Sequence, residues 1–272
     1  MSTSQDRLIL LASASPRRRA LFTLLGLPFQ VATADIDETP LPGEAADAYT
    51  ARLSHEKARA VQQRSGDQRA LVLAADTTVA DSGVILGKPA DPDEARAMLR
   101  RLRGRTHQVY TALTLLDDAS GRSLTDVAQT DVHMREYDDA ELEAYIASGD
   151  PFDKAGGYAI QHPGFHPVEA LHGCYTNVVG LPLCHVVWAL RQFGVEPNPQ
   201  VPLLCQRHHD GVCSLADDLL AGRTFPDGIA SACFFIVSEI RFRSRSTAGT
   251  AARCASTTAV SGRRAPTARK SS

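Results

Sequence analysis

Residues 8–19 read LILLASASPRRR, an apolar run followed by a short polar turn and three arginines. The run predicts a buried strand over Arg7–Ala12. A helix is expected over Pro16–Leu25, because Ser15 can cap it by accepting a hydrogen bond and Pro16 suits the first helical position. The chain therefore begins with a strand, a tight turn and a helix.

The arginines at this turn need an explanation. A helix N-terminus presents unpaired N–H groups and a positive potential, so Arg17, Arg18 and Arg19 are locally unfavourable there. A bound anion would offset the repulsion between these arginines and the helix N-terminus. The simplest is a phosphate chain held by backbone N–H groups, the hydroxyl of Ser13 or Ser15, and an arginine fork. The alternative, in which the arginines face water and pair with surface acids, stays open.

Strands and helices alternate through the first 195 residues, which is typical of an α/β protein whose sheet is covered by helices. Helices are also expected over Glu44–Gln63, Pro92–Leu102, Asp138–Ala147 and Leu181–Phe193. Extended segments are expected over Phe29–Ala34, Leu71–Ala75, Val109–Leu116, Ser123–Met134, Tyr158–Gln161 and Tyr175–Val179. Asp138 and Glu141 have the spacing of a capping box.

A carboxylate stands at the expected end of a buried strand. Asp76 follows the apolar run LVLAA of residues 71–75, and α/β sheets place ligand chemistry at such strand ends. Thr77 and Thr78 add hydroxyl groups. An aspartate there can bind Mg²⁺ or accept a proton from an attacking water, whereas the alternative is an aspartate that caps a turn.

Two lysines have the features of phosphate ligands. Lys57 lies on the apolar side of its expected helix, between Leu53 and Val61, and needs an anionic partner there. Lys88 is held extended by Pro89 and would project as a point charge. Alternatively, either lysine extends its ammonium into solvent.

Further polar candidates lie in two other segments. Asp35, Asp37 and Glu38 follow an expected strand and can supply a second set of oxygen ligands to a hard cation, unless they form a solvated loop. Gln161 offers one donor and one acceptor, which suits the O4 and N3–H edge of uracil or thymine. Otherwise Gln161 is a strand residue that faces water.

The composition is that of a soluble globular protein, with 43% hydrophobic and 22% charged residues among 272. The apolar run near the start is too short for a signal sequence or a membrane span. The six cysteines show no dense disulfide framework, so reduced thiols and a cytoplasmic location are expected, with no membrane partner.

The C-terminal part differs from the rest. A proline-broken linker, EPNPQVP, begins at Glu196. From Ser238 on, the sequence has eight of the 29 basic residues and only one acidic residue. We expect a domain over 1–195, an irregular extension over 196–237 and a disordered basic tail over 238–272. A nucleic-acid-binding arm and a segment translated from a shifted frame are the alternatives. A solvated tail is the more frequent outcome, so no stable nucleic-acid partner is expected.

A possible zinc site lies in the extension, where the ligand types are right but the spacing is unusual. Its candidate ligands are Cys205, His208, His209 and Cys213. The P-loop, α/β-hydrolase and zincin motifs GxxxxGK[ST], GxSxG and HExxH do not occur in the sequence, which disfavours those classes.

Six motifs stand in the order found in the Maf family of nucleotide pyrophosphatases: LASASPRR, RLSHEKA, AADTTV, GKP, DKAGGYAIQ and NVVGLPL. The chain resembles that family over Leu8–Phe193. The resemblance implies an elongated, two-lobed α/β fold with a mixed sheet flanked by helices, similar to inosine triphosphate pyrophosphatases. It also implies a homodimer and the hydrolysis of a nucleoside triphosphate to the monophosphate and pyrophosphate with Mg²⁺ or Mn²⁺.

The resemblance assigns roles by position. Asp76 corresponds to the catalytic proton acceptor and, with Glu38, to the metal site. The positions expected to bind substrate are Ser13, Arg17, Arg18, Lys57, Thr77, Lys88 and Gln161, of which Arg17, Thr77 and Gln161 match positions associated with substrate choice.

The combination SPRR, ADT and IQ resembles the branch that acts on dTTP and UTP. The segment His162–Tyr175 departs from the family's glycine-rich version, and Cys174 stands where a serine is common. Two rival functions stay open. One is a pyrophosphatase for modified purine or methylated nucleotides, and the other is a non-catalytic nucleotide-binding regulator of septum formation.

Overall fold

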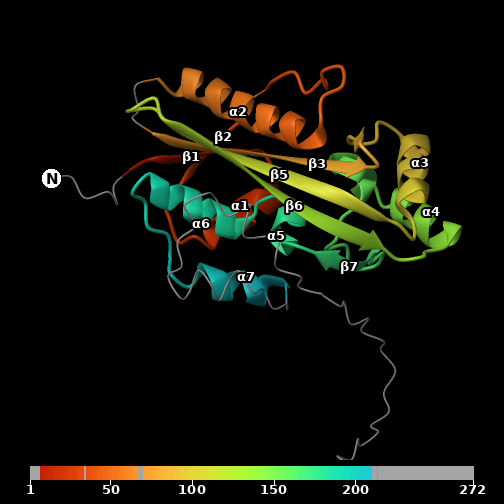
Figure 1. Ribbon diagram of the computed structural model, residues 1–272. Coiled ribbons are helices and arrows are strands. Elements are labelled where there is room, and N and C mark those ends of the chain that lie inside the picture. The colour runs from red at the N-terminus through yellow and green to blue at the C-terminus, as the bar shows by residue number, and fades with distance from the viewer. Residues whose placement is uncertain (1–6, 34, 67–69, 210–212, 214–272) are drawn as a thin grey trace, which may run out of the picture. The chain divides into compact units, whose positions relative to one another are not determined.

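A computed structural model describes residues 7–33, 35–66, 70–209 and 213 (Figure 1). Its mixed sheet has the strand order β2-β1-β3-β5-β6-β7, and β4 pairs with β3. The strands are β1 Ile9–Ala12, β2 Gln30–Ala32, β3 Leu71–Asp81, β4 Val84–Leu86, β5 Thr106–Asp117, β6 Ser123–Met134 and β7 Val168–His172. β1 runs parallel to β2 and β3, whereas the pairs β3–β5, β5–β6 and β6–β7 are antiparallel.

Helices cover both faces of this sheet. They are α1 Pro16–Thr23, α2 Ala46–Ser65, α3 Pro92–Leu102, α4 Asp139–Ala147, α5 Tyr175–Val179, α6 Leu183–Gln192 and α7 Val201–His209, with short 3₁₀ turns η2 Asp150–Asp153 and η3 Ala155–Gly157. α2 packs on one face, and α1, α5 and α6 lie against the other (Figure 1). The α/β fold with a mixed sheet flanked by helices is therefore confirmed.

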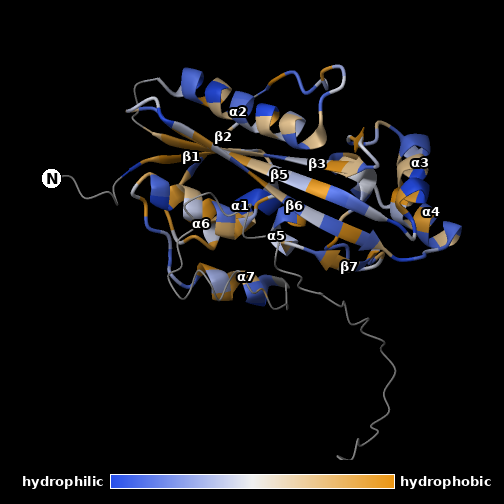
Figure 2. Cartoon of the chain, viewed as in Figure 1, coloured by the Kyte–Doolittle hydropathy of each residue, from blue (hydrophilic) through white to orange (hydrophobic). Residues whose placement is uncertain are grey.

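The central strand β3 is buried on both faces, which explains its continuous apolar run. Successive side chains of a strand point to opposite faces. Leu71 and Leu73 accordingly join the core under α1 and α6, whereas Val72 and Ala74 join a second core under α2. Figure 2 shows the apolar colouring concentrated on β1 and β3, between helices whose outer faces are hydrophilic. The sheet thus separates two apolar layers.

The predicted end of β3 is wrong. The sequence predicts a strand that ends at Asp76, but β3 continues to Asp81 because β5 pairs with it as far as Ala80↔Gln108. The parallel partner β1 is shorter and stops at Ala12↔Ala74. Asp76 therefore lies inside β3, two residues past the point where β1 ends. One flank of the strand is free of a neighbouring strand there.

Two other local predictions are wrong. Tyr175–Val179 forms helix α5 rather than a strand, because Gly180 adopts φ +114° and closes the helical turn, outweighing the strand preference of the β-branched residues. The strand in this region is instead β7, Val168–His172, which pairs with β6. Tyr158 is extended as expected, but Ile160 and Gln161 form a turn.

The start of the C-terminal extension is ordered. The sequence predicts irregular structure over 196–237, whereas residues 201–209 form α7, and the side chains of Val201 and Cys205 belong to the main core. Apart from Cys213, residues beyond 209 lie outside the described part of the chain, and so does the predicted tail over 238–272. The boundary at residue 195 remains a prediction.

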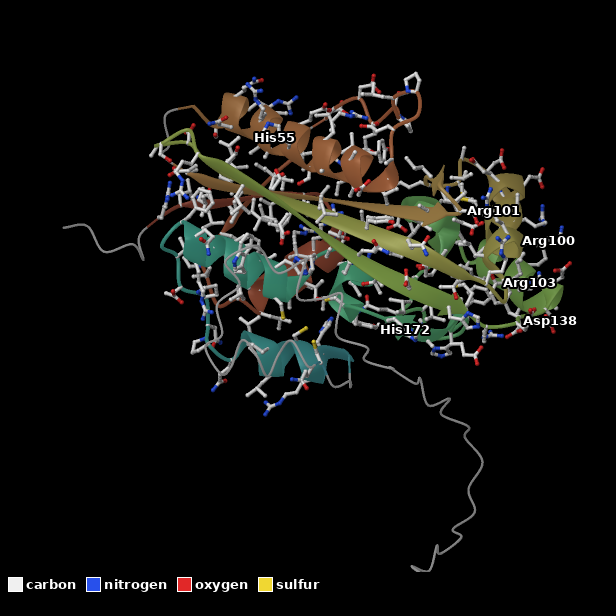
Figure 3. All side chains as sticks on the ribbon, viewed as in Figure 1. His55, Arg100, Arg101, Arg103, Asp138 and His172 are labelled. Atoms are coloured by element: carbon white, nitrogen blue, oxygen red, sulfur yellow. The ribbon has the colours of Figure 1, made fainter. Side chains whose placement is uncertain are left out.

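Several helix boundaries agree with the sequence. α3 begins at Pro92 and ends at Leu102 as predicted, and Ser15 caps α1 by accepting a hydrogen bond from the Arg18 backbone N–H. The capping box at α4 is present with both reciprocal hydrogen bonds, Glu141 N–H to Asp138 and Asp138 N–H to Glu141. Asp138 lies near Arg100, which belongs to α3, and Arg103, which directly follows α3 (Figure 3). These local signals were sufficient to place the N-termini of α1, α3 and α4, whereas the predicted bounds of α2 and α6 differ by one or two residues from Ala46–Ser65 and Leu183–Gln192.

We expect Asp138→Ala to lower the free energy of unfolding by about 1 kcal/mol, because it removes an N-cap acceptor and leaves a helix N–H without its partner. Urea unfolding monitored by circular dichroism measures the change. Asp138→Asn keeps a cap acceptor, so its free energy of unfolding should fall much less. Equal losses in the two variants would contradict the capping role.

Candidate functional site

A cavity opens beside β3 at the place where β1 ends. It is lined by parts of α1, α2, β3, the loop after β4, the DKAGGYAIQ segment and the end of α5. The residues predicted from the sequence that line it are Arg17, Arg18, Glu38, Lys57, Asp76, Thr77, Lys88 and Gln161. The fold thus brings side chains from distant positions in the sequence to one concave surface.

Ser13, a predicted phosphate contact, does not line this cavity. It is buried, and its Oγ accepts a hydrogen bond from the Ser15 backbone N–H at 3.2 Å. Ser15, its partner in the turn, lines the cavity instead. Ser13 therefore shapes the turn between β1 and α1, and its contact with phosphate stays a prediction.

The ammonium of Lys57 joins two carboxylates. Its Nζ lies 2.6 Å from Asp76 Oδ1 and 2.7 Å from Glu38 Oε1. The side chains of Lys57 and Asp76 are only 14% and 10% exposed, whereas that of Glu38 is 46% exposed. A lysine directed from the apolar side of α2 thus finds the anionic partner that the sequence requires, because burial of an unpaired ammonium is costly.

Glu38 is ionised more readily than an ordinary glutamate. Partial burial opposes its charge, but the hydrogen bond and charge of Lys57, together with the charges of Lys88 and Arg18, outweigh burial and hold the pKa below its usual value. Its backbone is fixed as well, since Tyr49 Oη donates to the Glu38 carbonyl at 2.7 Å. Burial and the nearby carboxylates of Asp76 and Glu38 raise the pKa of Tyr49 to about 12, so the phenol stays protonated.

Arg18 is held by two neighbouring groups that line the cavity. Its Nε donates to the Gly180 carbonyl at 2.7 Å, and its Nη2 donates to Thr77 Oγ1 at 2.9 Å. The side chain keeps some solvent exposure, yet its guanidinium is enclosed by protein, which lowers the pKa of Arg18, while the charge of Asp76 partly offsets the effect. A partly desolvated cation beside a cavity is suited to bind an anion.

Arg17 lies at the rim of the cavity. Its Nη1 is 3.1 Å from Asp153 Oδ2, so it pairs with a surface acid as the alternative interpretation expects. Asp153 also contacts the ammonium of Lys154, which is buried and bonded to Asp150 as well. Lys154 and Asp153 both line the cavity. The sequence does not single them out, because the two adjacent opposite charges at the start of DKAGG can pair with each other.

Lys88 and Gln161 approach from neighbouring loops, and both are exposed. The Gly156 N–H donates to the Gly87 carbonyl at 2.9 Å, which ties the GKP loop to the DKAGG segment. Gly156 has φ +70°, and a Cβ there would lie 3.0 Å from a methyl of Val79. This close approach requires glycine, and it places Lys88 beside the segment that carries Gln161.

The other predicted acids do not join the site. Asp35 and Asp37 are exposed and do not line the cavity. Asp37 instead accepts hydrogen bonds from Thr39, which lower its pKa and form a local turn. These two carboxylates belong to a solvated loop, as the alternative interpretation expects.

The candidate zinc residues do not form a metal site in the described part of the chain, where no cluster of three or more His, Cys, Asp or Glu side chains could hold a metal ion. Cys205 is buried and its Sγ lies 4.0 Å from Thr176 Oγ1, whereas His208 is exposed on α7. Burial of its thiol raises the pKa of Cys174 to about 11, and the nearby Cys213 adds to this effect. The side chain of His209 lies outside the described residues.

Comparison with known proteins identifies the family. Residues 8–193 match the family model for Maf-like proteins, and the chain belongs to that family. It is 49% identical over 199 residues to a dTTP/UTP pyrophosphatase of Chromobacterium violaceum, covering 72% of this chain and 99% of that protein. It is 51% identical over 192 residues to a dTTP/UTP pyrophosphatase of Myxococcus xanthus, covering 71% and 95%.

Among solved structures, the Staphylococcus aureus Ham1 protein matches with a TM-score of 0.35 and 14% identity, over 60% of this chain and 80% of that one. A likeness this slight carries no argument about function. None of the helices in the described ranges is both long and apolar enough to cross a membrane.

We expect Lys57→Met to raise the pKa of Glu38, because loss of the ammonium removes the largest stabilising partner of the carboxylate and leaves burial, which favours the neutral acid. A carbon-13 NMR titration of the Glu38 carboxyl, assigned with Glu38→Gln, measures the shift. In the wild type, the stability linked to ionised Glu38 is present above its ordinary pKa of 4.5 and is lost as the pH falls through the lowered folded value.

Arg96→Met serves as the control, since Arg96 pairs with Glu143 on α4 and not with Glu38. It should leave the Glu38 titration unchanged. A Glu38 pKa that is the same in Lys57→Met as in the wild type would refute the coupling of the two side chains.

Proposed function

We propose that this protein hydrolyses dTTP and UTP to the nucleoside monophosphate and pyrophosphate. The observation that carries the proposal is the convergence of the four predicted cationic side chains with the carboxylate of Asp76 around one cavity. These predicted cations are Arg17, Arg18, Lys57 and Lys88, and Lys154 lines the cavity as well. Relatives that match about 70% of the chain at close to half identity are dTTP/UTP pyrophosphatases, which supports this choice of substrate.

The cations suit a triphosphate. Arg18 offers a guanidinium already fixed by Thr77 and Gly180, so little side-chain freedom is lost when it binds a phosphate oxygen. Lys57 and Lys88 supply point charges, both of which act on Glu38. Neutralising the charge that grows on the leaving pyrophosphate is the largest contribution that such groups make to phosphoryl transfer.

A divalent cation fits the carboxylates of Glu38 and Asp76. Both reach the same cationic group, the Lys57 ammonium, so their oxygens already face a common point where positive charge is favourable. Mg²⁺ and Mn²⁺ prefer such hard oxygen donors, usually one or two carboxylates together with substrate phosphates. When bound, the metal would polarise the phosphate oxygens and neutralise part of their charge.

Asp76 is proposed as the proton acceptor. Its carboxylate orients a water molecule and takes a proton from it as the water oxygen attacks the α-phosphorus. The bond between the α-phosphorus and the bridging oxygen to the β-phosphate breaks, and pyrophosphate leaves with the electron pair. Its place within β3 makes the carboxylate rigid, because β5 pairs with the strand on both sides of Asp76.

Base recognition is assigned to three side chains that line the cavity. Gln161, Thr77 and Arg17 supply the polar groups, and the amide N–H of Gln161 can donate to O4 of uracil or thymine. The segment that departs from the family pattern, His162–Tyr175, directly follows Gln161 in the sequence and contains Cys174. Gln161→Glu and a panel of pyrimidine, inosine and methylated guanine triphosphates would separate the pyrimidine assignment from the purine one.

Two further properties are proposed from the family. A homodimer is expected, which light scattering coupled to gel filtration measures. A cytoplasmic location is the second property proposed from the family.

Asp76→Asn should lower kcat for dTTP and UTP by at least about 100-fold, because the amide cannot accept the proton of the attacking water. Pyrophosphate release is measured with a coupled phosphate assay. Asp93→Asn is the matched control, since Asp93 is exposed on α3 and should keep full activity. Retention of wild-type kcat by a folded Asp76→Asn variant would exclude the proposed role.

Removal of divalent metal with a chelator should abolish turnover, and added Mg²⁺ or Mn²⁺ should restore it. Hydrolysis in ¹⁸O-labelled water should place the label in the monophosphate and none in pyrophosphate, because the water attacks the α-phosphorus. Mass spectrometry of the two products decides this. Label in inorganic phosphate or pyrophosphate would show attack at another phosphorus.

A further inference from the structure

A chain of hydrogen bonds runs from the cavity into the protein interior. Arg18 Nη2 lies 2.9 Å from Thr77 Oγ1, and Thr77 Oγ1 lies 2.9 Å from Thr111 Oγ1. Thr111 Oγ1 in turn lies 2.9 Å from the Asn177 carbonyl oxygen. Thr77 lines the cavity, whereas Thr111 is fully buried behind it and does not.

The direction of each bond in this chain is fixed by its two ends. A hydroxyl group has a single proton, a carbonyl oxygen can only accept, and a guanidinium can only donate. Thr111 must therefore give its proton to the Asn177 carbonyl, and it can interact with Thr77 only by accepting. Thr77 then donates its own proton to Thr111 and accepts from Arg18.

Asn177, the last residue in this series of hydrogen bonds, is held firmly by its own side chain. The Asn177 amide Nδ2 donates to the Val109 carbonyl at 3.0 Å and to Thr130 Oγ1 at 2.8 Å. Thr77 and Thr111 are directly opposite each other on β3 and β5, so the sheet fixes the distance between their side chains. The sense of the hydrogen bonds is thus built into the fold.

This arrangement limits what Thr77 can do toward a ligand. Its proton is committed to Thr111, so the oxygen can offer the cavity a lone pair but no proton. Ionised phosphate oxygens also only accept, and they cannot pair with it. The complement of Thr77 in a nucleotide is therefore a hydrogen-bond donor. Uracil and thymine carry such a donor at N3, whereas the N3 of cytosine is itself an acceptor.

We propose that Thr111, a positioning residue outside the cavity, makes the site select uracil and thymine over cytosine by holding Thr77 as a hydrogen-bond acceptor. This inference rests on the proposed function and deepens it. It assigns the discrimination against cytosine to a residue that does not touch the substrate. Recognition of a ribose hydroxyl by Thr77 is the competing outcome, and it would not distinguish UTP from CTP, which share the same sugar.

The test compares kcat/KM for UTP and CTP in the wild type, Thr111→Val and Thr111→Ser. Valine has nearly the shape of threonine but cannot accept the Thr77 proton, so the Thr77 hydroxyl becomes free to turn and donate to N3 of cytosine. We expect the UTP to CTP ratio to fall about tenfold in Thr111→Val, the size of effect of one hydrogen bond. Thr111→Ser keeps the hydroxyl and should keep the wild-type ratio.

The outcomes separate this inference from the proposed function. If the wild type releases pyrophosphate from neither UTP nor dTTP, the proposed function fails. If the wild type is active and Thr111→Val lowers kcat/KM for UTP and for CTP by the same factor, the role of Thr111 in selection is overturned. Should Thr111→Val not fold by circular dichroism, Thr77→Val tests the same point, since its ratio must also fall. An unchanged ratio there overturns the inference equally.

Discussion

The ammonium of Lys57 lies between the carboxylates of Asp76 and Glu38, and the rest of the site is arranged around this contact. Each of the three groups comes from a different part of the fold: helix α2, strand β3 and the loop after β2. Because the nearly buried charges of Lys57 and Asp76 are stable only when they are paired, their contact links α2 to the sheet. The same pairing leaves the carboxylate oxygens facing a common point, where a cation is favoured.

The sheet explains why so much charge can converge there. β3 is covered on both faces along Leu71–Ala75, and it keeps its partner β5 while its other neighbour β1 ends. The strand therefore carries Asp76 and Thr77 out of the apolar layers without losing rigidity. Arg18 and Gly180 reach the same place from the far side of the sheet. A long strand beside a short one creates the cavity.

Much of the site could be predicted from single residues whose charge conflicts with their surroundings. Lys57 on an apolar helix face and Asp76 after an apolar run each require a partner, and both have one. Lys154 and Asp153 were missed, because two adjacent opposite charges satisfy each other on paper and suggest no cavity. Ser13 was placed correctly in the turn, but its hydroxyl is used by the backbone of Ser15.

The sequence by itself determined the elements whose signals are local. The Pro92–Leu102 helix and the capping box of Asp138 and Glu141 depend on residues within one or two turns, so propensity and capping suffice. Only the tertiary structure decided that β3 continues past Asp76 and that Thr77 faces Thr111. Those features depend on pairing between β3 and β5, segments that are distant in the sequence, for which a linear pattern holds no register information.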